Sequence, residues 1–284
     1  MEHFPEPESS QNINDSDYSH PGVLSLFKII WLTIRNFFTE KPGIIILSAI
    51  VLLMLWGYHG ELELLKMVWP AWHGPGIDIG SRPQIIPGIP WDNELISFWG
   101  GAILLVIVPI LIIRFGFKQK LADYGFGLPP KNRRKLAWWV FIILTVLSLP
   151  AFIMSTGDAD MQKLYPLYKP FYNVTSFVLY ELCYFPFFIV IEFIFRGYLL
   201  FGLAGIKETD TYNHSFQVSG YAILISMLSY TAWHLGKPVP ELWGTLIWGL
   251  AAGASALAVR SIWPIVFSHW LLNVVMDSIL SHLF

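Results

Sequence analysis

The stretch of sequence that decides the fold runs from residue 174 to 202 and reads VTSFVLYELCYFPFFIVIEFIFRGYLLFG. It is almost entirely apolar, and a run of about 20 such residues is long enough to cross the hydrocarbon core of a bilayer as a helix. Three charged side chains interrupt it, those of Glu181, Glu192 and Arg196. A charge at membrane depth costs about 2.5–3.5 kcal/mol on insertion scales, so each of these residues requires a partner or a function.

The composition of the whole chain leads to the same reading. The 284 residues are 55% hydrophobic and only 13% charged, which is more apolar side chain than one soluble core could bury. Apolar runs long enough to span a membrane lie near 43–58, 95–115, 136–154, 174–202, 218–235, 242–259 and 262–282. We therefore expect an all-α, polytopic transmembrane helix bundle of about seven spans.

The chain before the first span divides into two segments. Residues 1–22 hold five acidic and no basic side chains, so we expect a disordered acidic tail that lacks the positive region of a secretory signal. Residues 23–42 contain an apolar stretch with Lys28 and Arg35, which indicates an interfacial amphipathic helix, with an eighth span as the alternative. The expected domains that follow are the N-terminal spans and loops, 43–173, and a catalytic-type helical core, 174–284.

Basic residues predict the orientation, because lysine and arginine concentrate in cytoplasmic connections. The densest cluster lies in the connection 116–135 and consists of Lys118, Lys120, Lys131, Arg133, Arg134 and Lys135. We therefore expect a cytoplasmic N-terminus in a multi-pass protein of the plasma (inner) membrane. The net charge of −2 provides no basic face, so we exclude nucleic acid as a partner, and the single Cys183 excludes an internal disulfide.

Ionisable residues gather in the last four expected spans. They are Glu181, Glu192, Arg196, His234, His269 and Asp277, together with the amide of Asn273. Glu192 and Arg196 are four residues apart, the spacing of an ion pair on one helix face. His269, Asn273 and Asp277 recur every fourth residue, which predicts one polar stripe facing the bundle interior. Two histidines and a glutamate on separate helices can hold a metal or activate a water, while a purely structural ion pair is the alternative for Glu192 and Arg196.

Three short motifs resemble those of the CAAX prenyl protease and bacteriocin-processing (CPBP, or Abi) intramembrane proteases. Glu192-Phe-Ile-Phe-Arg196 is similar to the first motif, EExxxR, and Tyr230-Thr-Ala-Trp-His234 to the second, an aromatic residue followed four positions later by histidine. His269-Trp-Leu-Leu-Asn273 is similar to the final HxxxN motif, and the family's R-x-x-W-P lead-in precedes it from residue 260. The resemblance covers residues 174–284.

The resemblance implies an intramembrane metalloendopeptidase of the lipid bilayer that cleaves membrane-tethered or lipidated peptides near the bilayer surface. In that family a glutamate of the first motif activates the attacking water, and the histidines bind a metal or stabilise the oxyanion. Carried over to this chain, the expected catalytic residues are Glu192, Arg196, His234, His269 and Asn273. The expected ligands of a divalent metal such as Zn are His234, His269 and Glu192.

One position departs from the family pattern. The first of the two adjacent glutamates, usually assigned as the catalytic base, is Ile191 in this chain. Either Glu192 has taken over the role of base, or the chain is a catalytically silent membrane scaffold that keeps the fold. A proton-coupled transporter is a further alternative, which the absence of internal repeats disfavours.

Overall fold

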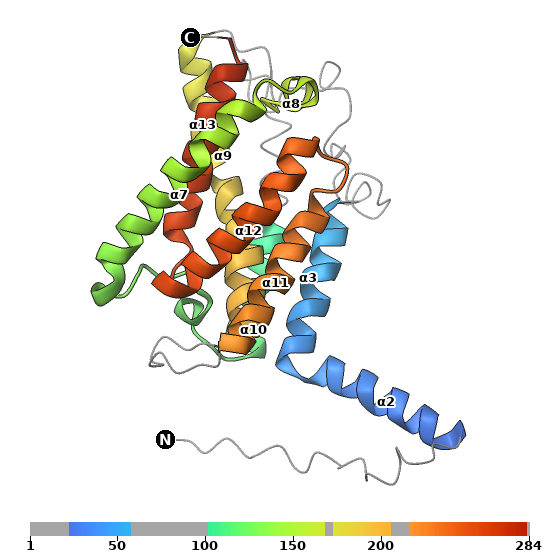
Figure 1. Cartoon of the computed structure of the whole chain (residues 1–284). Helices are drawn as coiled ribbons and strands as arrows, with labels where there is room; N and C mark the ends of the chain where they lie inside the picture. The colour runs from blue at the N-terminus through green and yellow to red at the C-terminus, as the bar shows by residue number, and fades with distance from the viewer. Residues whose placement is uncertain (1–22, 58–101, 168–172, 206–215, 283–284) are drawn as a thin grey trace. The chain divides into compact units, whose positions relative to one another are not determined.

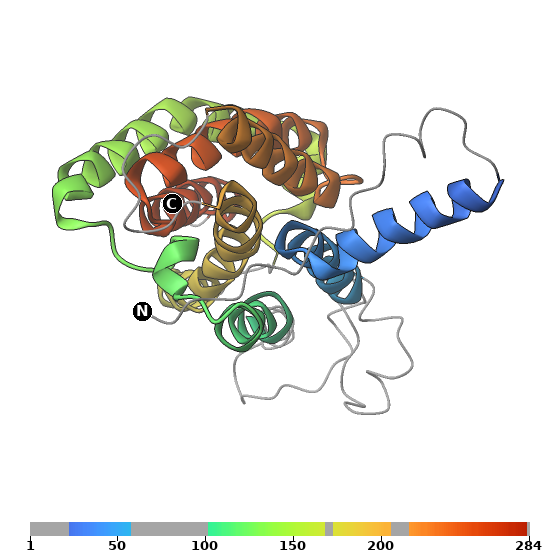
Figure 2. The same ribbon diagram turned by 90° about the horizontal axis from the view of Figure 1, so that it is seen from below.

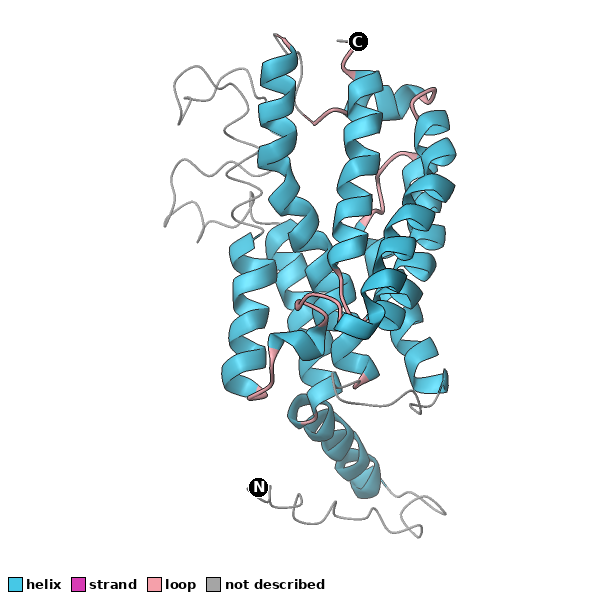
Figure 3. Cartoon of the chain, turned by 90° about the vertical axis from the view of Figure 1, so that its left-hand side faces the viewer, coloured by secondary structure: helices cyan, strands magenta, loops and turns pink. Residues whose placement is uncertain are grey.

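The structure is a computed structural model that describes residues 23–57, 102–167, 173–205 and 216–282. The expected acidic tail and the beginning of the expected second span, 95–101, lie outside these residues. Within the described ranges every regular element is a helix, as Figure 3 shows. The chain divides into two units, Met1–Ile44 and Ile45–Phe284.

The first unit contains α2 (Val23–Thr39), at the place where the interfacial helix is predicted. Several large apolar side chains on α2 are exposed, namely Leu26, Phe27, Ile30, Trp31, Ile34, Phe37 and Phe38. Such a surface is suited to the boundary between headgroups and acyl chains. The location of α2 on the membrane surface stays a prediction.

The second unit is a bundle of helices (Figure 1), and α3 (Lys41–Gly57) leads into it from the first unit. The following segments are η2 (Ile103–Ile107), α6 (Val108–Leu111), η3 (Ile112–Gly116), η4 (Leu121–Tyr124), η5 (Lys131–Arg133), α7 (Arg134–Ser155) and α8 (Ala159–Leu164). The C-terminal part consists of α9 (Val174–Glu192), η6 (Phe193–Phe201), α10 (Gly202–Ala204), α11 (Phe216–Trp233), α12 (Val239–Val259) and α13 (Trp263–Leu280).

Four helical stretches among the described residues are long and apolar enough to cross a membrane. They are Lys131–Ser155, Val174–Ala204, Val239–Val259 and Trp263–Leu280, and α2 with α3 would add a fifth if the two formed one broken span. The helix α11 and the shorter apolar helix Leu104–Gly116 lie where two more spans are predicted. The polytopic helical bundle is therefore supported, whereas the number of seven spans is not confirmed.

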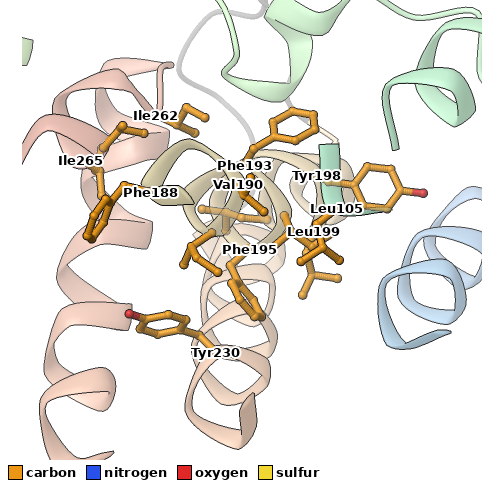
Figure 4. Packing of buried hydrophobic residues seen from close by; sticks show 14 of the residues in the cluster. Leu105, Phe188, Val190, Phe193, Phe195, Tyr198, Leu199, Tyr230, Ile262 and Ile265 are labelled. Atoms are coloured by element: carbon orange, nitrogen blue, oxygen red, sulfur yellow. The ribbon is translucent and has the colours of Figure 1, made fainter. Parts of the chain in front are cut away.

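The π-helical segment η6 lies in the middle of the second unit, where α9, α11 and α12 pack against it (Figure 2). All nine of its residues are buried. Apart from Arg196 the segment carries no charge, and a helix buried on every side lies in the interior of a bundle. Figure 4 shows Phe193, Phe195, Tyr198 and Leu199 of η6 at the centre of the apolar core.

The connection before α7 is fixed against the start of α13. Trp263 donates its indole N–H to the Phe126 carbonyl at 3.0 Å, and the Ser261 hydroxyl donates to the Gly127 carbonyl at 2.8 Å. Gly197 of η6 packs closely here, since a Cβ at this position would lie 3.2 Å from the Tyr124 carbonyl oxygen. The R-x-x-W-P lead-in therefore has a structural role, because it sets the position of α13 and of His269.

The basic connection also provides a test of the predicted orientation. A cysteine at Lys131, whose side chain is exposed, is expected to react with an impermeant thiol reagent from the cytoplasmic side only, in a Cys183→Ala background. A cysteine at Ser81, which lies outside the described residues, should react only from the opposite side. Labelling of both positions from one side would contradict the orientation.

Candidate active site

Glu192 is the last residue of α9, and its side chain is completely buried. Its Oε1 lies 2.7 Å from Nδ1 of His269 and accepts a longer hydrogen bond of 3.4 Å from the indole of Trp248. Because an ionised carboxylate can only accept, Nδ1 carries the proton, and Nε2 of His269 is the ring nitrogen left for a ligand. The π-helix begins at the next residue, and such segments are frequent at functional sites.

Arg196 lies one turn further along η6 and is also completely buried. Its Nε lies 3.4 Å from Oε2 of Glu192, so the structure contains the ion pair that the spacing predicts. The guanidinium carbon lies 4.0 Å from the centre of the Tyr230 ring, an arrangement that stabilises the cation electrostatically. Oε1 of Glu192 therefore contacts His269 and Trp248, and Oε2 contacts Arg196.

His234 follows directly after the end of α11 and is buried. Its Nδ1 lies 2.8 Å from the Tyr230 carbonyl oxygen, and its ring packs edge-on against the Tyr230 ring at 4.4 Å. A carbonyl can only accept, so Nδ1 carries a proton and Nε2 is the free nitrogen. That nitrogen faces Glu241, whose Oε1 is 3.5 Å away.

Glu241 lies beside His234 but was not among the site residues predicted from the sequence. It lies in the first turn of α12, and the Tyr165 hydroxyl donates to its Oε1 at 2.8 Å. Burial raises the pKa of Tyr165 well above its usual range, so the hydroxyl keeps the proton that it donates. The expected sixth span began at residue 242, which left Glu241 in a connection. The signal that could have found it is Pro238-Val-Pro240, because proline is frequent at the start of a helix and acidic residues are favoured in the first turn.

Asn273 and Asp277 lie on the polar stripe of α13, and both are buried as that stripe predicts. The Asn273 amide donates to Oδ2 of Asp277 at 2.9 Å. Glu181 of α9 is also buried and interacts electrostatically with Asp277. These three residues form a second buried polar group, one turn beyond His269.

The structure brings the predicted site residues together to different degrees. Glu192, Arg196 and His269 are in direct contact. His234 is joined to them through Tyr230, because its Nδ1 lies at the Tyr230 carbonyl and the Tyr230 ring faces Arg196. The Tyr230 ring also packs against Phe195, with 5.2 Å between the ring centres. Figure 4 shows these two aromatic side chains beside each other. The two histidines are also near enough to interact electrostatically. The catalytic roles of these residues stay predictions.

The ion pair and the His269 imidazole differ in their exposure to the surroundings of the protein. The side chains of Glu192 and Arg196 are 0% exposed, whereas that of His269 is 16% exposed. The rings of Phe188 and Trp248 lie 5.0 and 5.2 Å from the His269 ring and form apolar walls beside it. A ligand can therefore reach the imidazole of His269, but not the ion pair behind it.

The expected metal triad of Glu192, His234 and His269 is not assembled. In the part of the chain that the structure describes, no group of three or more His, Cys, Asp or Glu residues is placed to hold a metal ion. Glu192 is hydrogen-bonded to His269, and His234 faces Glu241 instead. The described residues therefore form no ready-made metal cluster, and the metal that the resemblance implies stays a prediction.

The fold and the buried groups define the class: an all-helical integral membrane protein with ionisable residues gathered in its C-terminal helices. Residues 173–275 match the family model described as type II CAAX prenyl endopeptidase Rce1-like. This match confirms the resemblance to the CPBP proteases, and it contains the residues of all three motifs. No curated protein and no solved structure matched the chain.

Proposed function

We propose that this chain is a CAAX-type intramembrane endopeptidase that cleaves a membrane-tethered or lipidated peptide with an activated water. The observation that carries the proposal is the buried 2.7 Å contact between Glu192 and His269, which lies within the stretch that matches the protease family. A carboxylate that fixes the tautomer and orientation of an imidazole is a recurring part of hydrolytic sites. The partial exposure of His269 makes this imidazole available to a substrate.

In the proposed reaction Glu192 acts through His269. The carboxylate is completely buried, and Arg196 and His269 lie against its two oxygens, so it does not reach a substrate directly. It holds Nδ1 of His269 and directs Nε2 away from the ion pair. Glu192 is therefore a positioning residue in this proposal, and His269 is the group that contacts the reacting atoms.

His269 and Asn273 are assigned to the carbonyl oxygen of the scissile bond. They lie four residues apart on α13 and therefore on the same helix face. In its protonated form His269 donates from Nδ1 to Glu192 and from Nε2 to the oxyanion, while the Asn273 amide has a second N–H beside the one that it donates to Asp277. Such donors lower the barrier most when they are fixed in advance, and Glu192 and Asp277 fix these two side chains. The attacking water needs a proton acceptor elsewhere in the site.

Ile191 favours a second candidate function, that of a catalytically silent scaffold. Its side chain is 2% exposed and belongs to the apolar core, at the position where the family motif has its first glutamate. A chain without any replacement for that carboxylate would bind a lipidated peptide without cleaving it.

The two functions differ in whether a bound peptide is cut. The purified protein in lipid vesicles is expected to cleave a farnesylated peptide that ends in a CAAX sequence, with mass spectrometry of the products as the measurement. The same peptide without the farnesyl group serves as the matched control and should be cleaved more slowly. Binding of the farnesylated peptide without cleavage would support the scaffold, and neither binding nor cleavage would contradict both functions.

A further inference from the structure

Glu241 and His234 form a second pair of a carboxylate and an imidazole, separate from Glu192 and His269. Nδ1–H of His234 donates a hydrogen bond to the Tyr230 carbonyl, which leaves Nε2 as an acceptor. Oε1 of Glu241, an acceptor when ionised, lies 3.5 Å from this nitrogen. An arrangement in which two acceptors face each other is stable when a donor with two hydrogens, such as water, donates a hydrogen bond to each of them.

The surroundings of Glu241 hold its carboxylate in one place. The Tyr165 hydroxyl donates to Oε1, and the first turn of α12 favours a negative charge there. Oε2 is buried and has no hydrogen-bonding partner among the described residues. The side chain of Glu241 is 16% exposed and that of His234 is 7% exposed, so a water can reach the pair although most of it is enclosed.

We propose that Glu241 is a further catalytic residue, which binds the attacking water together with His234 and accepts its proton. In this way α12 supplies the carboxylate that Ile191 removes from the first motif. The proposal rests on the proposed function and names the base of the same site. It requires no rotation of α9 and no release of Glu192 from Arg196.

The reaction proceeds in two steps. The water oxygen forms a bond to the carbonyl carbon of the scissile peptide, the electron pair of the C=O bond moves onto its oxygen, and one water proton passes to Glu241. His269 and Asn273 hold the resulting oxyanion. The C=O bond then re-forms, the C–N bond breaks, and the proton on Glu241 passes to the leaving nitrogen, so that the products are a carboxylic acid and an amine. His234 keeps the second hydrogen bond to the water and directs its lone pair at the carbon.

The test compares Glu241→Gln with wild type on the farnesylated peptide in vesicles. The substitution keeps the shape of the side chain but removes the proton acceptor, so kcat is expected to fall by about 10²-fold with little change in KM. Glu40→Gln makes the same chemical change at an exposed position and should leave kcat unchanged. The Nε2 resonance of His234, measured by NMR on histidine-labelled protein, is expected to shift in Glu241→Gln and not in Glu40→Gln.

Tyr165 is a positioning residue in this proposal and provides a second variant if Glu241→Gln does not fold. Tyr165→Phe removes only the hydroxyl that donates to Glu241, and kcat is expected to fall by about tenfold. Tyr221→Phe, the same change on the exposed face of α11, should have no effect. If Glu241→Gln cleaves the peptide at the wild-type rate, the role of Glu241 is overturned while the proposed function stands. If Glu241→Gln is unfolded, the same result for Tyr165→Phe leads to the same conclusion. Absence of cleavage by the wild type would overturn both.

Discussion

Replacing His269 with glutamine is expected to lower turnover of the farnesylated peptide by about 10²-fold or more, the scale of a lost acid–base or oxyanion-stabilising group. The amide of glutamine can still donate to Glu192, but it has no second ring nitrogen to direct at the scissile carbonyl. Because the native contact to Glu192 is 2.7 Å long and Phe188 and Trp248 enclose the ring, little backbone movement should accompany the change. Initial rates in vesicles measure the effect.

The matched control for this variant is His282→Gln, because His282 is exposed and lies beyond the end of α13. It should turn over the peptide at the wild-type rate. Folded yield and melting temperature are measured beside each rate. If His269→Gln unfolds the protein instead of slowing it, the contact between Glu192 and His269 is structural, and its assignment to the reaction is wrong.

Replacing Arg196 with methionine is expected to lower the free energy of unfolding by about 3–5 kcal/mol, the usual effect of removing one partner of a buried ion pair. Glu192 would stay in the core without its counter-charge, since both side chains are 0% exposed. The contact of the guanidinium with the Tyr230 ring would also be lost. Unfolding in mixed micelles with increasing denaturing detergent measures the change.

Two further variants distinguish the effect of the lost ion pair on stability from the effect of the changed side-chain volume. Arg114→Met makes the same change at an exposed position and should alter stability little. The double variant Arg196→Met with Glu192→Gln removes the unpaired carboxylate but keeps an acceptor for His269, so it should lose less than Arg196→Met alone. Equal losses in the single and double variants would show that packing, and not charge, accounts for the effect.

Local pattern was sufficient to predict the helices and the faces that they bury. Apolar runs predicted α7, the continuous stretch of α9, η6 and α10, and α12 and α13 to within a few residues, because a helix in a bilayer must be apolar along most of its length. The spacing of Glu192 and Arg196 predicted their ion pair, since residues four apart are neighbours on a helix. The limits of single spans were less certain, and the number of spans is not confirmed.

Partners on different helices could not be predicted in the same way. Trp248 contacts Glu192 from 56 residues further along the chain, and Glu241 contacts His234 from 7 residues further along. No periodic pattern connects either pair. The motif alone left two alternatives, that Glu192 replaces the carboxylate lost at Ile191 or that the chain is a catalytically silent scaffold. We propose a different replacement, because Glu241 faces His234 whereas Glu192 is enclosed by Arg196, Trp248 and His269.

The sequence by itself determined that this chain is a helical membrane protein and that Glu192, Arg196, His234 and His269 belong to three protease-like motifs. Both follow from local chemistry, since the bilayer excludes unpaired polar groups and each motif lies on one helix or at its end. Only the tertiary structure decided which carboxylate meets which imidazole. That choice depends on how η6, α11, α12 and α13 pack around one another, because hydrogen bonds act over about 3 Å and a small change in packing would exchange the partners.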